Sequence, residues 1–222
     1  RSFHVTGVQT CALPISDIDV RTATSKPDVD LTSTLRSPRE DAKPLLAERL
    51  SDEEEMWTAL VIGLRDYIGK NGFTSVALGL SGGIDSAVVA TLAVDALGKD
   101  RVFGVSLPSK YSSEHSLSDA KSLASNLGIE YRVIEIEPVV QSFLKATTLS
   151  EVAEENVQAR VRGSLLMGLS NQEGHLILAT GNKSELAVGY STLYGDAVGG
   201  FAPIKDIFKV DVWRLARWRN GL

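Results

Sequence analysis

Two kinds of apolar pattern alternate along residues 51–220. Short runs rich in Val, Ile and Leu predict buried strands, and longer stretches with apolar residues three or four positions apart predict helices. The first helix should begin at Ser51 or Asp52, either of which can cap it, and should end at Asn71-Gly72. The elements predicted next are a strand at 76–80, a helix at 86–97 ended by Gly98, a strand at 102–107, a helix at 114–127 ended by Gly128, a strand at 131–136, helices near 139–144 and 152–169, a strand at 176–180, and a short helix that carries Glu185.

This alternation predicts an α/β fold. Strands separated by helices form a parallel sheet with helices on both faces, because each helical crossover returns the chain to the same direction. Rossmann-like sheets of this kind bind ligands beyond the carboxyl ends of their strands, where the winding direction reverses. The loops that leave the strands are therefore the places where chemistry is expected.

Residues 1–50 have a different composition. Residues 17–50 are rich in Ser, Thr, Pro and charged residues, which predicts an extended linker or surface arm. The string V-T-G-V-Q-T-C-A-L-P-I resembles the translation of a sequencing-library adapter, so we expect residues 1–16 to be an artefact, including Cys11. The alternative, an export signal, would need a continuous apolar core of about 7–15 residues, which this string lacks.

Composition and charge exclude several classes of function. Hydrophobic residues make up 43% of the chain and charged residues 23%, as in ordinary globular proteins. No stretch approaches the roughly 20 apolar residues of a membrane helix. A net charge of −5 without a Lys/Arg run argues against binding to nucleic acid or to an anionic membrane. A single cysteine forms neither an internal disulfide nor a structural zinc site, which fits a reducing, cytoplasmic setting.

The exit of the first predicted strand carries the strongest chemical signal. Leu78-Gly79-Leu80 runs into Ser81-Gly82-Gly83-Ile84-Asp85-Ser86, where a helix is predicted to begin. Adjacent glycines let the backbone approach a ligand, and the serine hydroxyls and helix N-terminus add donors for an anion. The lysine of a Walker A loop and the G-x-G-x-x-G fingerprint are both missing. Asp85 would repel a phosphate unless it holds Mg²⁺ against it. The alternative is a strand–helix turn without a ligand.

The predicted long helix offers a second candidate site. Asn156 and Arg160 lie four residues apart and so share one helix face. The planar fork of an arginine suits phosphate recognition, whereas Arg162 lies off this face. The alternative for both arginines is an ordinary solvated helix surface.

The exit of the fourth predicted strand offers a third. Thr180 ends the strand, and Glu185 follows on the short helix, where it could face Asp85 and complete a Mg²⁺ site that leaves room for phosphate and water. The alternative for Glu185 is a capping role in a helix begun by Asn182 or Ser184. The two roles are compatible.

Two loops complete the set of candidates. Residues 191–209 are glycine-rich and long enough to form a lid or substrate loop. Asp196 in this loop could accept a hydrogen bond from a substrate, and Lys209 could offset phosphate charge, although either residue alone is more typical of a plain surface. Residues 106–111 could meet adenine through backbone groups or form an ordinary loop.

These motifs together resemble a known family. S-G-G-x-D-S is similar to the PP-loop of N-type ATP pyrophosphatases, which have an adenine nucleotide alpha hydrolase-like fold and cleave ATP between its α and β phosphorus atoms. Residues 51–220 resemble the synthetase domain of glutamine-dependent NAD synthetases, through S-G-G-I-D-S, L-P-S-K-Y-S, E-N-V-Q-A-R-V-R, A-T-G-N-K-S-E-L-A-V-G-Y and L-Y-G-D-A-V-G-G-F-A-P-I-K-D. Leu193 stands where shorter ammonia-dependent relatives carry a lysine, which favours the glutamine-dependent branch.

The resemblance implies roles for individual residues. Asp85 and Lys209 would be catalytic, and Asp85 and Glu185 would hold Mg²⁺. The residues implied to bind ATP are Gly79, Leu80, Ser81, Gly82, Gly83, Ile84, Asp85, Ser86, Thr180 and Lys209. The residues implied to contact deamido-NAD are Asn156, Arg160, Glu185, Tyr190 and Asp196.

The resemblance also implies a reaction and partners. The nicotinate carboxylate of deamido-NAD would attack the α-phosphorus of ATP, and ammonia would then displace AMP to give NAD⁺. Relatives obtain the ammonia from glutamine through a glutaminase domain and form homo-oligomers. We expect residues 51–222 to be a synthetase domain clipped at its C-terminus, and this chain alone to be weakly active or inactive. The alternatives are another PP-loop amidotransferase similar to GMP synthetase, and a nucleotide-binding module without catalysis.

Overall fold

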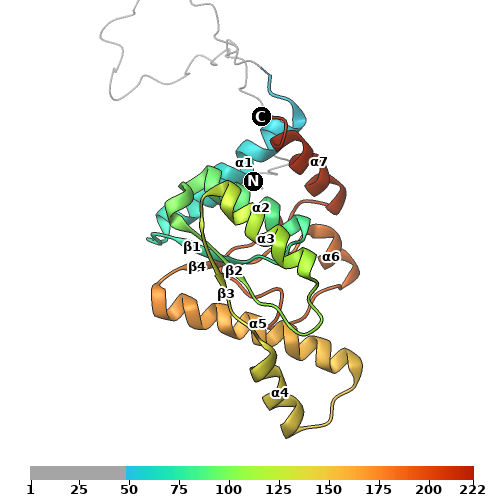
Figure 1. Ribbon diagram of the computed structural model, residues 1–222. Helices are drawn as coiled ribbons and strands as arrows, with labels where there is room; N and C mark the ends of the chain where they lie inside the picture. The colour runs from blue at the N-terminus through green and yellow to red at the C-terminus, as the bar shows by residue number, and fades with distance from the viewer. Residues whose placement is uncertain (1–48) are drawn as a thin grey trace, which may run out of the picture. The chain divides into compact units, whose positions relative to one another are not determined.

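Figure 1 shows the computed structural model of the protein, which describes residues 49–222. The predictions for residues 1–16 and for all but the end of the arm at 17–50 lie outside the described residues. Ser51–Leu222 forms one compact unit. Its elements are α1 (Asp52–Lys70), β1 (Val76–Gly79), α2 (Ile84–Leu97), the 3-10 helix η1 (Lys99–Arg101), β2 (Val102–Ser106), α3 (Glu114–Leu127), β3 (Glu130–Val133), α4 (Glu137–Ala146), α5 (Glu151–Glu173), β4 (Leu176–Leu178), α6 (Lys183–Val188) and α7 (Lys209–Arg219).

The four strands form one parallel sheet in the order β3-β2-β1-β4. Val76 of β1 pairs with Val102 of β2 on one side and with Leu176 of β4 on the other. The chain winds outward from β1 to β3 and then crosses back to place β4 beside β1. The predicted parallel α/β sheet is therefore confirmed, and its winding reverses between β1 and β4.

Helices cover both faces of the sheet (Figure 1). One face carries α1, α2, α3 and α7, and the other carries α5 with α4 packed against it. Side chains alternate along β1: Val76 and Leu78 enter the first core layer, and Ala77 enters the layer under α5. A strand buried on both faces has to be apolar throughout, which explains the short Val/Ile/Leu runs. None of the helices in residues 49–222 is both long and apolar enough to cross a bilayer.

Local signals set most helix ends where the sequence predicts them. The Ser51 side chain caps α1 by accepting a hydrogen bond from the backbone N–H of Glu54 at 3.2 Å. Asn71 ends α1, and Gly128 ends α3 in the left-handed conformation with φ 67°. The predicted strand at 131–136 is shorter, because Ile136 already has helical backbone angles and Pro138 lies in the first turn of α4.

A chain of hydrogen bonds ties the carboxyl ends of β1 and β2 to a side chain of β3. The Tyr131 hydroxyl donates to Ser106 Oγ at 2.9 Å, and Ser106 Oγ donates to the carbonyl of Leu80 at 2.7 Å. A Cβ on Gly104 would come within 2.5 Å of the Leu80 side chain, so the absence of one lets Leu80 pack over β2. These contacts fix the point at which the chain leaves β1.

Replacing Ser106 with Ala should destabilise the fold, because the buried Leu80 carbonyl loses the Ser106 donor. We expect a loss of about 1–3 kcal/mol in the free energy of unfolding. Tyr131→Phe should cost less, because Ser106 keeps its bond to Leu80. Urea unfolding measures both, with Ser118→Ala on the exposed surface of α3 as control. Equal stability of S106A and S118A would show that this hydrogen-bond chain does not hold the strand ends.

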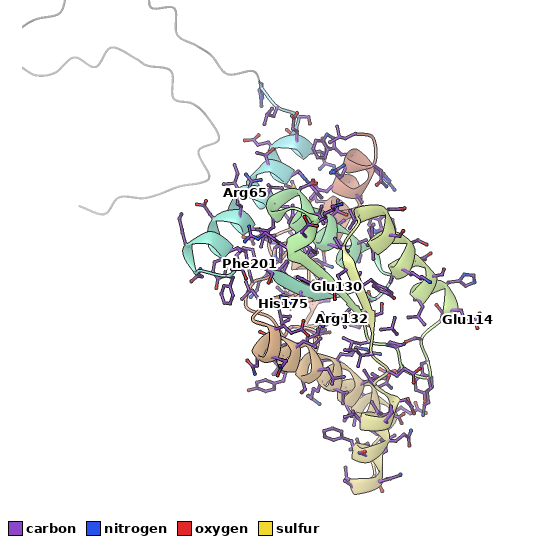
Figure 2. The ribbon with its side chains drawn as sticks, turned by 60° about the vertical axis from the view of Figure 1, so that its left-hand side comes forward. Arg65, Glu114, Glu130, Arg132, His175 and Phe201 are labelled. Atoms are coloured by element: carbon purple, nitrogen blue, oxygen red, sulfur yellow. The ribbon has the colours of Figure 1, made fainter. Side chains whose placement is uncertain are left out.

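A second polar network joins β3 to the amino ends of β1 and β4. Arg132 bonds Glu130 at 2.8 Å and Glu173 at 2.5 Å, and Glu173 lies 3.0 Å from His175 Nε2. His175 Nδ1 lies 2.7 Å from the hydroxyl of Ser75, at the entry of β1. Figure 2 shows Glu130, Arg132 and His175 close together. The hydrogen bond from Arg132 lowers the pKa of the Glu173 carboxyl, and a weaker bond from His175 adds to this.

Glu173 should therefore stabilise the fold in a pH-dependent way. A carboxyl whose pKa is lower in the folded state stabilises above its unfolded pKa of about 4.5, and this contribution is lost as the pH falls through the lower folded value. Glu173→Gln should reduce the loss of stability between pH 7 and pH 3, measured by urea unfolding. Glu135→Gln, at an exposed carboxylate, is the control. An unchanged acid response in E173Q would contradict the assignment.

Candidate functional site

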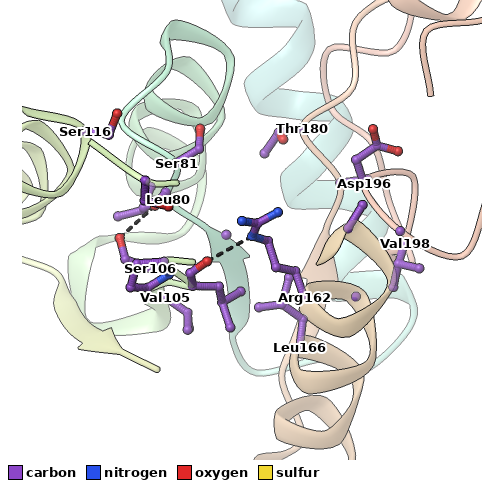
Figure 3. A pocket seen from close by; sticks show the side chains of 18 of the residues that line it. Leu80, Ser81, Val105, Ser106, Ser116, Arg162, Leu166, Thr180, Asp196 and Val198 are labelled. Carbon is purple, nitrogen blue, oxygen red and sulfur yellow. Dashed lines mark hydrogen bonds between the residues drawn. The ribbon is translucent and has the colours of Figure 1, made fainter. Parts of the chain in front are cut away.

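One cavity opens where the sheet topology predicts a ligand. It has a volume of about 450 Å³, within the range of small-molecule sites, and lies at the carboxyl ends of β1, β2 and β4. Figure 3 shows it from close by. The strand exits supply Gly79, Leu80, Ser81, Val105, Ser106, Leu107, Pro108, Leu178, Ala179 and Thr180, α5 supplies Ala159, Arg162, Gly163 and Leu166, and the rest comes from the α3 region and from Gly195, Asp196 and Val198. Apolar walls of this kind suit a flat ring such as a nucleobase.

A smaller cavity of about 210 Å³ adjoins the first. Ser81, Thr180 and Asp196 line both cavities, so the two form neighbouring parts of one site. The second cavity is more polar in character and is lined by Asp85, Ser86, Gly181, Glu185, Tyr190, Ser191 and Lys205, among others. The predicted loop at 81–86 thus lies where the two cavities meet.

The loop at 81–86 is held by its own hydrogen bonds. Ser81 Oγ accepts from the backbone N–H of Gly83 at 3.2 Å. The buried Ser86 hydroxyl donates to the carbonyl of Gly83 at 3.0 Å and accepts from the N–H of Ser81 at 3.3 Å. Gly82 has φ +79°, and a Cβ there would lie 2.4 Å from the carbonyl oxygen of Ser116. Ser86 therefore shapes the loop, in addition to lining the second cavity.

The helix that follows begins without a side-chain cap. Gly83 is the N-cap of α2, and no side chain accepts a hydrogen bond from the first turn. The first-turn N–H groups and the positive end of the helix dipole remain available to an anion. Ile84, the first residue of α2, packs against the core and anchors this turn.

Four side chains connect the loop to distant elements. Asp85 Oδ1 accepts from Asn182 Nδ2 at 3.1 Å, and Asp85 Oδ2 forms an ion pair with Lys209 Nζ at the start of α7. The fully buried Asn182 also accepts from the N–H of Glu185 at 3.1 Å, and Glu185 Oε2 accepts from the N–H of Asn182. Asp85, Glu185 and Lys209 are therefore brought together around Asn182.

Glu185 forms the predicted capping box and also lines the second cavity with Asp85. Two carboxylates facing one cavity are an oxygen donor set that suits Mg²⁺. No group of three or more Asp, Glu, His or Cys residues that could hold a metal occurs in the described part of the chain. A cation held here would therefore need further ligands from a bound phosphate or from water.

Asn156 and Arg160 share a face of α5, as their spacing predicts, but neither lines the two cavities. Asn156 Oδ1 accepts from the Thr192 hydroxyl at 2.8 Å, and Arg160 Nε donates to the carbonyl of Leu193 at 3.2 Å. They hold the loop that begins at residue 191. In the same loop, Asp196 accepts from the N–H of Thr192 at 2.7 Å and faces both cavities.

Tyr190 and Arg162 complete the site. Tyr190 lies at the rim of the second cavity with 76% of its surface exposed. Arg162 lines the first cavity and donates from Nε to the carbonyl of Leu107 at 2.9 Å (Figure 3). Sequence reasoning assigned no role to Arg162. The nearby small residues Ala159 and Gly163 reflect a different constraint, because a Cβ on Gly163 would come within 2.9 Å of the Tyr194 carbonyl oxygen, so no local sequence signal marks Arg162.

Fold and site together define a class of protein. The parallel α/β sheet, the Ser-Gly-Gly turn that leads from β1 to an uncapped helix, and the cavity beside that turn are features of the PP-loop fold. The family model described as NAD synthase matches residues 56–221. The chain belongs to the NAD synthase family.

Individual relatives agree with this assignment. The chain is 56% identical over 175 residues to the glutamine-dependent NAD(+) synthetase of Thermotoga maritima, covering 76% of the chain and 30% of that protein. Among solved structures, it is similar to a glutamine-dependent NAD+ synthetase from Acinetobacter baumannii in complex with ADP, with a TM-score of 0.77 and 49% identity over 79% of this chain and 34% of the other. It is also similar to an NH3-dependent NAD synthetase from Campylobacter jejuni, with a TM-score of 0.73 and 37% identity. That match covers 77% of this chain and 75% of the other. The chain spans about a third of the length of the curated relatives that it matches.

Replacing Gly82 with Ala should distort the loop at the junction of the cavities. Gly72 provides a matched control, because its φ of +73° is similar but no atom lies within 4 Å of its Cβ position. We expect Gly72→Ala to lower the free energy of unfolding by about 1–2 kcal/mol, because alanine disfavours the left-handed backbone. Gly82→Ala should lower it by about 1–3 kcal/mol more, because its Cβ would also press against Ser116. Urea unfolding measures the difference, and equal losses would show that Gly82 is not pressed against α3.

Proposed function

We propose that this chain is the synthetase part of a glutamine-dependent NAD synthetase and amidates deamido-NAD to NAD⁺ with cleavage of ATP to AMP and pyrophosphate. The observation that carries the proposal is the placement of the 81–86 loop between a nucleobase-sized cavity and a second cavity lined by Asp85 and Glu185. Family membership and the names of the relatives support it. Residues 51–222 would form the synthetase domain.

The adenine nucleotide would bind with its base in the larger cavity and its phosphates on the loop. The backbone N–H groups of the loop and of the first turn of α2 would bind phosphate oxygens. Thr180, which lines both cavities, would contact the nucleotide at their junction. Lys209 would offset phosphate charge next to Asp85, and Asn182 would hold Asp85 in place.

The first step would join the two substrates. A nicotinate carboxylate oxygen of deamido-NAD forms a bond to the α-phosphorus of ATP, and the bond between that phosphorus and the bridging oxygen of the β-phosphate breaks to release pyrophosphate. In the second step, the ammonia lone pair attacks the activated carbonyl carbon, AMP leaves with the carboxylate oxygen, and ammonia loses a proton to give the amide. No protein nucleophile is needed, so positioning and charge stabilisation supply the rate enhancement.

The two acidic side chains fit a magnesium ion. Asp85 and Glu185 would hold Mg²⁺ in the second cavity, and the ion would neutralise charge on the triphosphate. Asn156, Arg160, Tyr190 and Asp196 would contact deamido-NAD, directly or through the loop that begins at residue 191. This placement is supported by the contacts of Asn156 and Arg160 with that loop and by the position of Asp196 on both cavities.

The partners of the whole protein follow from its relatives. Ammonia would come from glutamine through a glutaminase domain, because the most similar relatives are named as glutamine-dependent. A homo-oligomer in the cytoplasm is the setting that this family resemblance favours. Neither nucleic acid nor a membrane is proposed as a partner.

Exchange of labelled pyrophosphate into ATP tests the first step without requiring ammonia. We expect the chain to catalyse this exchange in the presence of deamido-NAD but not of xanthosine monophosphate, the substrate of GMP synthetase-like enzymes. A radiolabel detects exchange even at low turnover. Exchange with xanthosine monophosphate alone would favour the GMP synthetase-like alternative.

Asp85→Asn separates an enzyme from a passive nucleotide binder. Losing the carboxylate should reduce the exchange rate on the order of 100-fold, because charge stabilisation at the phosphates is lost, while much of the affinity for ATP remains. Asp119→Asn, at an exposed carboxylate on α3, is the control. Undiminished exchange in D85N, or no binding of ATP by the unaltered chain, would contradict the proposed function.

A further inference from the structure

We propose that Arg162 binds the α-phosphate of the adenine nucleotide and so makes this site selective for nucleotides over nucleosides. This inference rests on the proposed function, because it assumes that the larger cavity takes an adenine nucleotide. It adds a phosphate contact from α5, which lies on the opposite face of the sheet from the loop at 81–86 and its helix.

Arg162 is the one cation among the described residues that line the larger cavity. Its side chain reaches from α5 across the carboxyl end of the sheet, and Figure 3 shows the guanidinium between the β2 exit and Thr180. The hydrogen bond from Nε to the Leu107 carbonyl at 2.9 Å fixes the plane of the group. A guanidinium anchored at Nε keeps its two terminal nitrogens as a fork that matches phosphate geometry.

The terminal nitrogens of Arg162 have no anionic partner among residues 49–222 in this structure. None of the ion pairs in that part of the chain includes Arg162, and Asp196, the other ionisable residue on the cavity wall, instead accepts from Ser191 and Thr192. Burial lowers the pKa of the guanidinium, but the group is so basic that it stays charged. A partly buried charge without a partner favours an anionic ligand, because the ligand restores the interactions lost with water.

The layout of the two cavities selects the phosphate, because Arg162 lines the larger cavity and does not line the second. The base fills the larger cavity, and the 81–86 loop lies at the junction with the second cavity. The phosphate next to the nucleoside must pass this junction, whereas the β- and γ-phosphates lie further along the loop. The α-phosphate stays on the adenosine through adenylation and in AMP, so Arg162 would hold the same group in both steps of the reaction.

Binding of ATP, AMP and adenosine tests this assignment by calorimetric titration of the 222-residue chain. Arg162→Gln should weaken the binding of ATP and of AMP by a similar factor of about 10- to 100-fold, which is the range for a charged hydrogen-bonded contact. The affinity for adenosine, which lacks the phosphate, should change by less than about twofold. Arg162→Lys should give an intermediate loss, because it keeps the charge but not the fork. Arg65→Gln is the matched control, since Arg65 donates to backbone carbonyls of α2 away from the site.

Each other outcome has a definite meaning. An equal loss for adenosine would overturn the proposal and place Arg162 on the base or the ribose, by stacking or hydrogen bonding. Unchanged affinity for ATP and AMP in R162Q, or a loss confined to deamido-NAD, would also overturn it. Retained adenosine binding shows that the cavity of the variant is intact. If the unaltered chain binds none of the three ligands, the proposed function itself fails.

Discussion

The site depends on one backbone constraint, the turn that the chain makes as it leaves β1. Gly82 adopts a left-handed conformation with the carbonyl of Ser116 pressed against it, and Ser86 bonds back to the loop. Ser106 and Tyr131 hold the preceding residue, Leu80, from the neighbouring strands. Because this turn is fixed from both sides, the uncapped start of α2 faces the junction of the two cavities.

The charged groups of the site come from elements far apart in the sequence. Asp85 lies on α2, Glu185 on α6 and Lys209 on α7, and the buried side chain of Asn182 joins the first two. Arg162 approaches from α5 on the other face of the sheet. The proposed nucleotide site thus combines a rigid backbone cradle with charges whose relative positions depend on the whole fold, so changes to the packing of α6 or α7 should affect the proposed chemistry.

The sequence predicted the fold well because the signals were local and repeated. The positions of the helices and strands followed from the apolar runs and from the helix-end signals at Ser51, Asn71-Gly72 and Gly128. The alternation of strands and helices then required a parallel sheet. The loop at 81–86 was also predictable, because its glycines and Asp85 are adjacent in sequence. The ion pair of Asp85 with Lys209 and the hydrogen bond from Arg162 to Leu107 join residues 124 and 55 positions apart. No local pattern encodes such contacts, and the indirect role of Asn156 and Arg160 depends on how the loop after α6 returns to α5.

Backbone amide NMR can show whether the turn at residues 81–86 binds the phosphates of an adenine nucleotide. Titration of the chain with ATP and Mg²⁺ should move the amide signals of Gly82, Gly83 and Asp85 the most, with smaller changes at Leu107 and Thr180. If the nucleotide binds while these loop amides keep their chemical shifts and the largest changes fall elsewhere, the phosphates bind in another part of the molecule and not at this turn.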